Sequence, residues 1–100
     1  MTFQTLDGKK WKIWWKYDEV LYPVLLHRGI VEMAVSQRTI CYIKKVEDLN
    51  SEDVKIGWTD CSPSDKFTKE VGRKISLTRA LEAFSERENR RAAWRSYLAR

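Results

Sequence analysis

The chain has few of the residues from which metal centres and disulfide frameworks are built. Its 100 residues include two cysteines, two prolines, four glycines and a single histidine, His27. Cys41 and Cys61 stand far apart with no CxxC spacing, so a zinc site lacks ligands. We expect reduced thiols, no metal and no cofactor. A single disulfide is the alternative only in an oxidising compartment.

Long apolar runs are also missing. The longest, residues 20–26, contains Pro23 and falls far short of the length that spans a membrane. The first residues, MTFQTLDGKK, lack the basic, apolar and small-residue zones of a secretory signal. We therefore expect a cytoplasmic protein that contacts no membrane. The length predicts one domain, residues 1–100, too short for an active-site cleft between domains.

Positive charge is concentrated in the C-terminal third. Residues 1–64 carry nine basic and nine acidic side chains, whereas residues 65–100 carry ten and five, which supplies the whole net charge of +5 (10 − 5). Such an excess attracts polyanions or acidic protein surfaces. The alternative is a solvated helical face that keeps the protein soluble.

Residues 9–60 read as a succession of strands. Residues 10–17 alternate, with Trp11, Ile13 and Trp15 on one face and the lysines with Trp14 on the other. Residues 20–26 are a buried strand or a short helix, and Pro23 indicates an edge, a bulge or a break.

Further strands are expected after a turn at Gly29. Alternation predicts a strand over residues 30–36, a tight connection at Ser36-Gln37-Arg38, a strand over residues 39–46 and, beyond a polar loop, another over residues 54–59. Short connections favour an antiparallel meander over a parallel sheet.

The periodicity becomes helical after Asp60. Ser62-Pro63-Ser64-Asp65 fits a capping box and predicts a helix from Pro63. Gly72 is a predicted left-handed stop and Ser76 a second start. The apolar stripe of that second helix is Leu77, Ala80, Leu81 and Phe84. Ser85-Glu86-Arg87-Glu88 resembles another capping box, so a kink or a third short helix is expected there.

These elements predict an α+β fold. We expect a four- or five-stranded, mainly antiparallel sheet from residues 9–60, covered on one face by two or three helices from residues 63–99. The predicted core consists of Trp11, Ile13, Trp15, Val31, Met33, Val35, Ile56, Trp58, Phe67, Val71, Leu77, Leu81 and Phe84.

The segment KKWKIWWKY is the first candidate binding site. Lys12 and Lys16 attract phosphates, and Trp14 on their face can stack on a base or anchor a protein interface. Trp11 and Trp15, on the other face, are expected in the core.

A second candidate is the basic set on the predicted helices. It comprises Arg73, Lys74 and Arg79, with Arg90 and Arg91 beyond. These side chains can grip a phosphate backbone or an acidic protein patch. A helix-turn-helix is a minority reading, because the first helix is short and follows a sheet.

No catalytic constellation is evident. Nucleophilic catalysis needs a base within reach of an activated serine or cysteine, and His27 is the only histidine. Cys61 lies just before a predicted helix start, a position that can lower the pKa of a thiol and make it reactive. The alternative is that the Cys61 side chain is buried against Trp58. We expect no enzyme. An enzyme or small-molecule binder using Cys61 or His27 is the third class of function.

Residues 61–81 resemble a pattern in small phage and prophage accessory proteins of uncharacterised role. The resemblance rests on Cys61, Pro63, Asp65 and Phe67, followed by Gly72-Arg73-Lys74-Ile75 and Arg79-Ala80-Leu81. It implies a virus-encoded protein of the host cytoplasm that binds and redirects a host or defence component, and it implies no catalytic residue. The positive charge departs from the acidic inhibitors that mimic DNA.

The functional expectation is a non-enzymatic accessory protein of the phage type. It binds and inhibits or redirects a host macromolecular complex, and a counter-defence protein, similar to an anti-CRISPR inhibitor, is one form of this. The partner is then a host or defence protein complex. The alternative is a small basic nucleic-acid-binding module that uses the lysines and arginines of both candidate sites.

Overall fold

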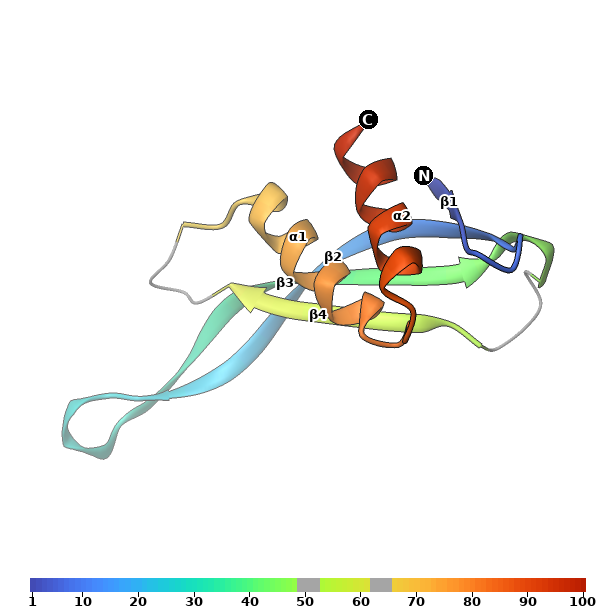
Figure 1. Ribbon diagram of the computed structural model, residues 1–100. Helices are drawn as coiled ribbons and strands as arrows, with labels where there is room; N and C mark the ends of the chain where they lie inside the picture. Colours follow the sequence, from blue (N-terminus) through green and yellow to red (C-terminus); the bar gives the residue numbers. More distant parts are fainter. Residues whose placement is uncertain (49–52, 62–65) are drawn as a thin grey trace.

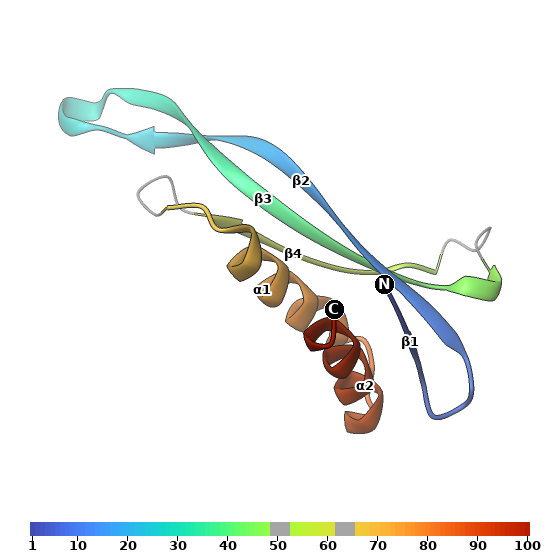
Figure 2. The same ribbon diagram turned by 90° about the horizontal axis from the view of Figure 1, so that it is seen from above.

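The computed structural model describes residues 1–48, 53–61 and 66–100. Within these residues, the strands β1 (Thr2–Gln4), β2 (Lys10–Leu25), β3 (Val31–Lys45) and β4 (Lys55–Cys61) form an antiparallel sheet in that order. Two helices, α1 (Lys69–Leu81) and α2 (Arg87–Leu98), then cover the same face of the curled sheet (Figures 1 and 2). The α+β fold, the meander and the one-sided helix layer are thus confirmed.

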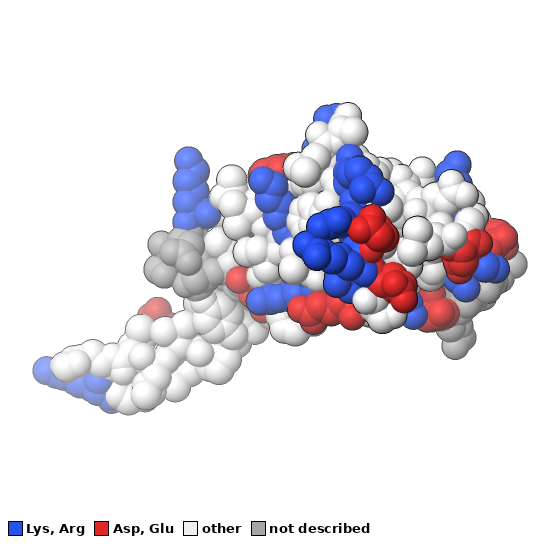
Figure 3. Space-filling view, viewed as in Figure 1, with Lys and Arg blue, Asp and Glu red and all other residues white. Residues whose placement is uncertain are grey.

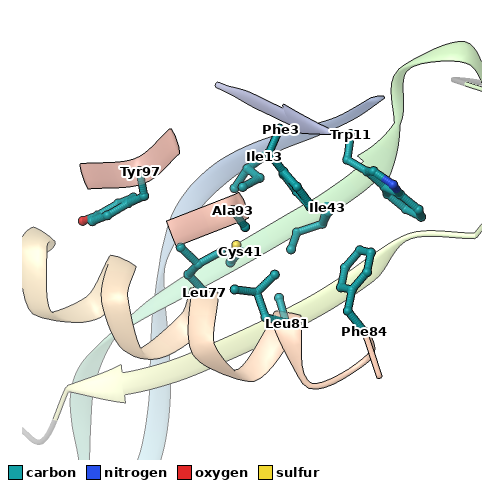
Figure 4. Packing of buried hydrophobic residues seen from close by; sticks show 11 residues of the cluster. Phe3, Trp11, Ile13, Cys41, Ile43, Leu77, Leu81, Phe84, Ala93 and Tyr97 are labelled. Atoms are coloured by element: carbon teal, nitrogen blue, oxygen red, sulfur yellow. The ribbon is translucent and has the colours of Figure 1, made fainter. Parts of the chain in front are cut away.

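The core lies between the helices and one end of the sheet (Figure 4). It comprises Phe3, Trp11, Ile13, Cys41, Ile43, Leu77, Ala80, Leu81, Phe84, Ala93 and Tyr97. Phe84, just after α1, meets the Trp11 ring edge-on at 4.9 Å between centroids. The Trp11 indole nitrogen donates a hydrogen bond of 3.2 Å to the Thr5 hydroxyl, so this buried donor is satisfied.

Two glycines let α1 approach the sheet closely. A Cβ atom on Gly57 in β4 would overlap the backbone of Ser76 and Ala80 in α1. A Cβ atom on Gly72 in α1 would overlap the hydroxyl of Thr39 in β3. The helix therefore packs directly on strand backbone and on a short side chain, with no space for a larger residue at either position.

β2 and β3 form a hairpin much longer than the rest of the sheet. Their register runs from Trp11 opposite Lys45 to Leu25 opposite Val31. The far half projects beyond the helices (Figure 2). The radius of gyration is consequently 16.5 Å, whereas a compact chain of this length has about 13 Å.

The strand boundaries differ from the sequence prediction in the middle of the chain. The predicted connection at Ser36-Gln37-Arg38 is wrong, because β3 continues through it as one strand. Two of these polar residues contact the neighbouring strand β4: the Ser36 hydroxyl donates to the Cys61 carbonyl at 2.5 Å, and Arg38 forms an ion pair with Asp60. β2 likewise continues through Pro23, where β1 no longer pairs with it.

The helix boundaries also need correction. Gly72 is not a stop and Ser76 is not a start, because both lie inside α1. Gly72 is required by the approach to Thr39, and the Ser76 hydroxyl donates to the Gly72 carbonyl at 2.7 Å. The predicted start at Pro63 lies outside the described residues, and α1 itself begins at Lys69. A further helix after Phe84 is confirmed as α2.

Six residues of the predicted core are exposed. They are Val31, Met33, Val35, Ile56, Trp58 and Val71. The first three lie on the projecting hairpin, where the helices do not reach. Gly57 faces α1, whereas Ile56 and Trp58 lie on the other face of the sheet, and α1 does not cover that face. Trp11, Ile13, Leu77, Leu81 and Phe84 are buried as predicted.

Candidate binding surfaces

The eight residues proposed from sequence do not form one surface. Lys12, Trp14 and Lys16 lie on the sheet face away from the helices, because their neighbours Trp11 and Ile13 are buried beneath the helices. The other five lie on α1 and α2, on the opposite side of the sheet. We therefore consider the two groups separately.

The cations at the start of α1 converge on Glu70. Arg73 donates to Glu70 at 3.1 Å and also to the Tyr17 hydroxyl at 3.2 Å. Lys74 and Arg100 approach the same carboxylate at 3.6 and 3.2 Å. The hydrogen bond from Arg73, with support from Arg100, lowers the pKa of Glu70 to about 2. Arg73 therefore ties α1 to β2 as well as carrying charge.

This cluster makes stability depend on acid. A depressed carboxyl pKa stabilises the folded state above the unfolded value, and the contribution disappears as pH falls from about 4.5 to about 2. Glu70→Gln should reduce thermal stability near pH 6 and reduce it much less near pH 2.5, as followed by circular dichroism. Glu88→Gln, which removes one exposed pair with Arg91, is the control and should change stability little at either pH. An equal loss at both pH values would contradict the electrostatic explanation.

Three further arginines have partners within the chain. Arg79 donates to the Trp58 carbonyl of β4 at 2.7 Å. Arg90 donates to the carbonyls of Phe84 and Ser85, which follow the end of α1. Arg91 pairs with Glu88 one turn away at 3.1 Å. These contacts give the helical cations structural roles, and none of them requires a ligand.

The projecting part of the β2–β3 hairpin, residues 20–36, is here called the arm. It carries seven of the fourteen large apolar side chains that are exposed among the described residues. Leu21, Leu25 and Met33 are 62%, 74% and 58% exposed on one face of it. Val20, Tyr22 and Val24 occupy the other face. Of these 17 residues only Arg28 and Glu32 carry a full charge. Figure 3 shows the arm as pale, with blue at its end.

The backbone of the arm is also open on both sides. Among the described residues, 20–25 of β2 and 31–36 of β3 pair only with each other, because β1 and β4 end nearer the body. The tip is the 3₁₀ turn η1 (His27–Gly29), where Leu26 donates to the Ile30 carbonyl at 2.6 Å. Arg28 has a φ of 69°, a left-handed conformation uncommon for a residue with a side chain.

The second surface is the sheet face without helices, here called the outer face. Trp14 of β2 and Tyr42 of β3 are directly opposite in register and stack with centroids 5.3 Å apart and planes 14° apart. The ammonium of Lys12 lies 5.8 Å from the Trp14 ring, and that of Lys16 lies 5.7 Å from the Tyr42 ring. We call these four residues the platform. Tyr42 was not singled out from sequence.

The residues considered for catalysis do not meet. His27 is at the tip of the arm, about 20 Å of strand away from the position of β3 that pairs with Cys61. A hollow of about 360 Å³ beside α1 is lined by Cys61 together with Phe67, Val71 and Ile75. No histidine lines it. In the described part of the chain, no three histidine, cysteine or acidic side chains gather where they could hold a metal ion.

The two thiols should differ in reactivity. Cys41 is fully buried, and burial raises its pKa to about 12. Cys61 is only half-buried. Titration of the native protein with a thiol reagent should therefore modify one cysteine quickly, and Cys61→Ser should abolish this fast phase. Denatured protein should react at both positions. Fast modification of native Cys61→Ser would show that Cys41 becomes accessible.

No helix of the described ranges combines the length and the apolar character that crossing a bilayer requires. Comparisons with models of known families, with curated proteins and with solved structures find no match for this chain.

Proposed function

We propose that this protein is a non-enzymatic accessory protein of the phage type, which binds a host protein complex through the arm and so inhibits or redirects it. The observation that carries the proposal is an apolar ribbon that neither described helix covers, with Leu21, Leu25 and Met33 well exposed on one face. The resemblance of residues 61–81 to phage and prophage proteins supports the phage origin. Action in the host cytoplasm follows from that origin. A host defence complex is one partner of this class.

The arm has the sequence of a buried strand pair. Strands that are apolar on both faces are typical of sheets covered on both sides. In this chain Leu21 and Leu25 are exposed on one face, and Val20 and Tyr22 receive no helix on the other. A two-stranded ribbon alone in water is only marginally stable. We therefore expect another molecule to bury the apolar side chains of the arm.

A different protein is favoured over a second copy of the chain. Face-to-face contact of two arms covers only one face of each, and two bodies of net charge +5 repel each other. A groove in a larger protein covers both faces at once.

The chemistry of the arm specifies the groove. The walls of the groove should be apolar. A strand of the partner at the rim of the groove can also pair with the backbone of the arm, where β2 and β3 pair only with each other among the described residues. The groove should be acidic at its end, because the tip carries Arg28. A left-handed residue is usually glycine or asparagine. Arg28 keeps this conformation at a φ of 69° although its side chain makes it unfavourable, which supports a role for its positive charge in binding.

The proposal is tested by affinity purification of the tagged protein from host cells after nuclease treatment. The variant Leu25→Glu with Met33→Glu puts two charges on the apolar face, and the control Leu98→Glu changes an exposed leucine at the end of α2. The wild type and the control should recover the same protein in similar amounts. The arm variant should recover at least tenfold less, since buried anchors dominate protein interfaces.

Three outcomes would contradict the proposal. Equal recovery by the arm variant would place the interface elsewhere. Recovery of the tagged chain alone, as a dimer that the arm variant dissociates, would assign the arm to self-association. Recovery of nothing above background by the wild type would remove the inhibitor hypothesis.

A further inference from the structure

The platform lies on the outer face, which neither described helix covers, and its chemistry differs from that of the arm. It pairs two stacked aromatic rings with two lysines, one near each ring. Trp14 and Tyr42 contribute nothing to the buried core, which lies on the other face of β2 and β3. The two surfaces share no residue, so they can be tested independently.

Charge on the outer face is uneven. Lys10, Lys12 and Lys16, all exposed, lie at the platform end. Two carboxylates of this face, Asp18 and Asp60, lie farther toward the arm, where both adjoin Arg38 in register and Asp60 binds it at 2.7 Å. The platform end therefore presents positive charge to solvent, and its natural complement is an anion.

The spacing suits a polymer more than a single anion. Lys12 and Lys16 are four residues apart on one strand, which is about 13 Å. Phosphates of one nucleic-acid strand recur about every 3.4 Å along a helix axis, so the two lysines reach different phosphates. Trp14 and Tyr42 stand between these cations, where an unpaired base can stack on them.

We infer that the outer face binds single-stranded nucleic acid, with Lys12 and Lys16 on the backbone and a base stacked on Trp14 and Tyr42. A single strand is favoured over a duplex because the rings need an unpaired base. It is favoured over an acidic peptide because a peptide of carboxylates offers no ring to stack. Recognition by stacking and phosphate contact is tolerant of sequence.

Binding of a labelled oligothymidylate of about 15 nucleotides, followed by fluorescence anisotropy at about 50 mM salt, tests the charge requirement. Lys12→Glu with Lys16→Glu should weaken binding at least tenfold. It should also make the slope of log affinity against log salt shallower by about 1.4, or 0.7 for each phosphate that a lysine no longer neutralises. The matched control, Arg87→Glu with Arg95→Glu on α2, changes the net charge equally and should weaken binding less than about threefold.

The rings are tested with Trp14→Leu and Tyr42→Leu, after circular dichroism has verified that each variant folds. Each should weaken oligothymidylate binding at least fivefold. Neither should change the binding of inorganic polyphosphate, which has charge but no bases.

Four results would overturn the inference. They are no oligonucleotide binding at low salt, equal losses from the two charge-reversal pairs, oligonucleotide binding unaffected by the ring variants, and displacement of the oligonucleotide by polyglutamate at equal charge concentration. The last result would identify an acidic protein as the ligand. None of these results bears on the arm, whose residues are unchanged in every variant.

Discussion

We expect Gly57→Ala to lower the free energy of unfolding by about 3 kcal/mol, a large part of the 5–15 kcal/mol typical of a domain. The added methyl group would overlap the Ser76 and Ala80 backbone and lie 2.8 Å from the Arg79 carbonyl carbon. Backbone atoms cannot rotate away as a side chain can. α1 must therefore shift as a whole, which loosens Leu77 and Leu81 in the core.

Chemical denaturation of the variant measures this effect. Ile56→Ala is the matched control, because its side chain is exposed on the other face of the same strand, and it should change the free energy by no more than about 0.5 kcal/mol. A cost for Gly57→Ala as small as that of the control would mean that α1 does not pack directly on the β4 backbone.

Removal of the arm should abolish binding of the protein partner and leave the body folded. Val20 and Ser36 are register partners, so Asn-Gly can replace residues 21–35 as a two-residue hairpin turn. The Ser36 contact with Cys61 and the whole platform are retained. The radius of gyration should fall from 16.5 Å toward about 12 Å.

Thermal unfolding, small-angle scattering and affinity purification together follow this variant. The melting temperature should stay close to that of the wild type, because the arm contributes no residue to the core. Oligothymidylate binding should persist, which separates the two surfaces. Unfolding of the shortened chain would show that the arm stabilises the body, and retention of the protein partner would exclude the arm as its site.

Sequence periodicity predicted the layers of this fold better than their boundaries. Alternation placed Trp11 and Ile13 inward and Trp14 outward, because one buried face is enough to set the phase of a strand. Gly72 and Ser76 were misread as helix signals. Local rules assign them to helix ends, whereas in the structure Gly72 lets α1 approach Thr39 of the sheet and the Ser76 hydroxyl donates to the Gly72 carbonyl within α1.

The exposure of the arm could not be predicted, because alternating apolar residues do not show whether the same chain or another molecule buries them. Val31, Met33 and Val35 have the pattern of a core strand, and their exposure follows only from where the helices end. The opposite holds for Arg73, Arg79 and Arg90. Their charge is evident in the sequence, but their partners Glu70, Trp58 and Phe84 are brought to them by packing.

Photo-crosslinking from the arm tests the central claim most directly. A photoreactive amino acid replaces Leu25 in the arm or, as the control, Leu98 at the end of α2, both of which are well exposed. Irradiation in host cells should give a discrete covalent product with one larger protein from position 25 and none from position 98. Crosslinks to that protein from position 98 alone, or only to a second copy of the chain from position 25, would contradict the account.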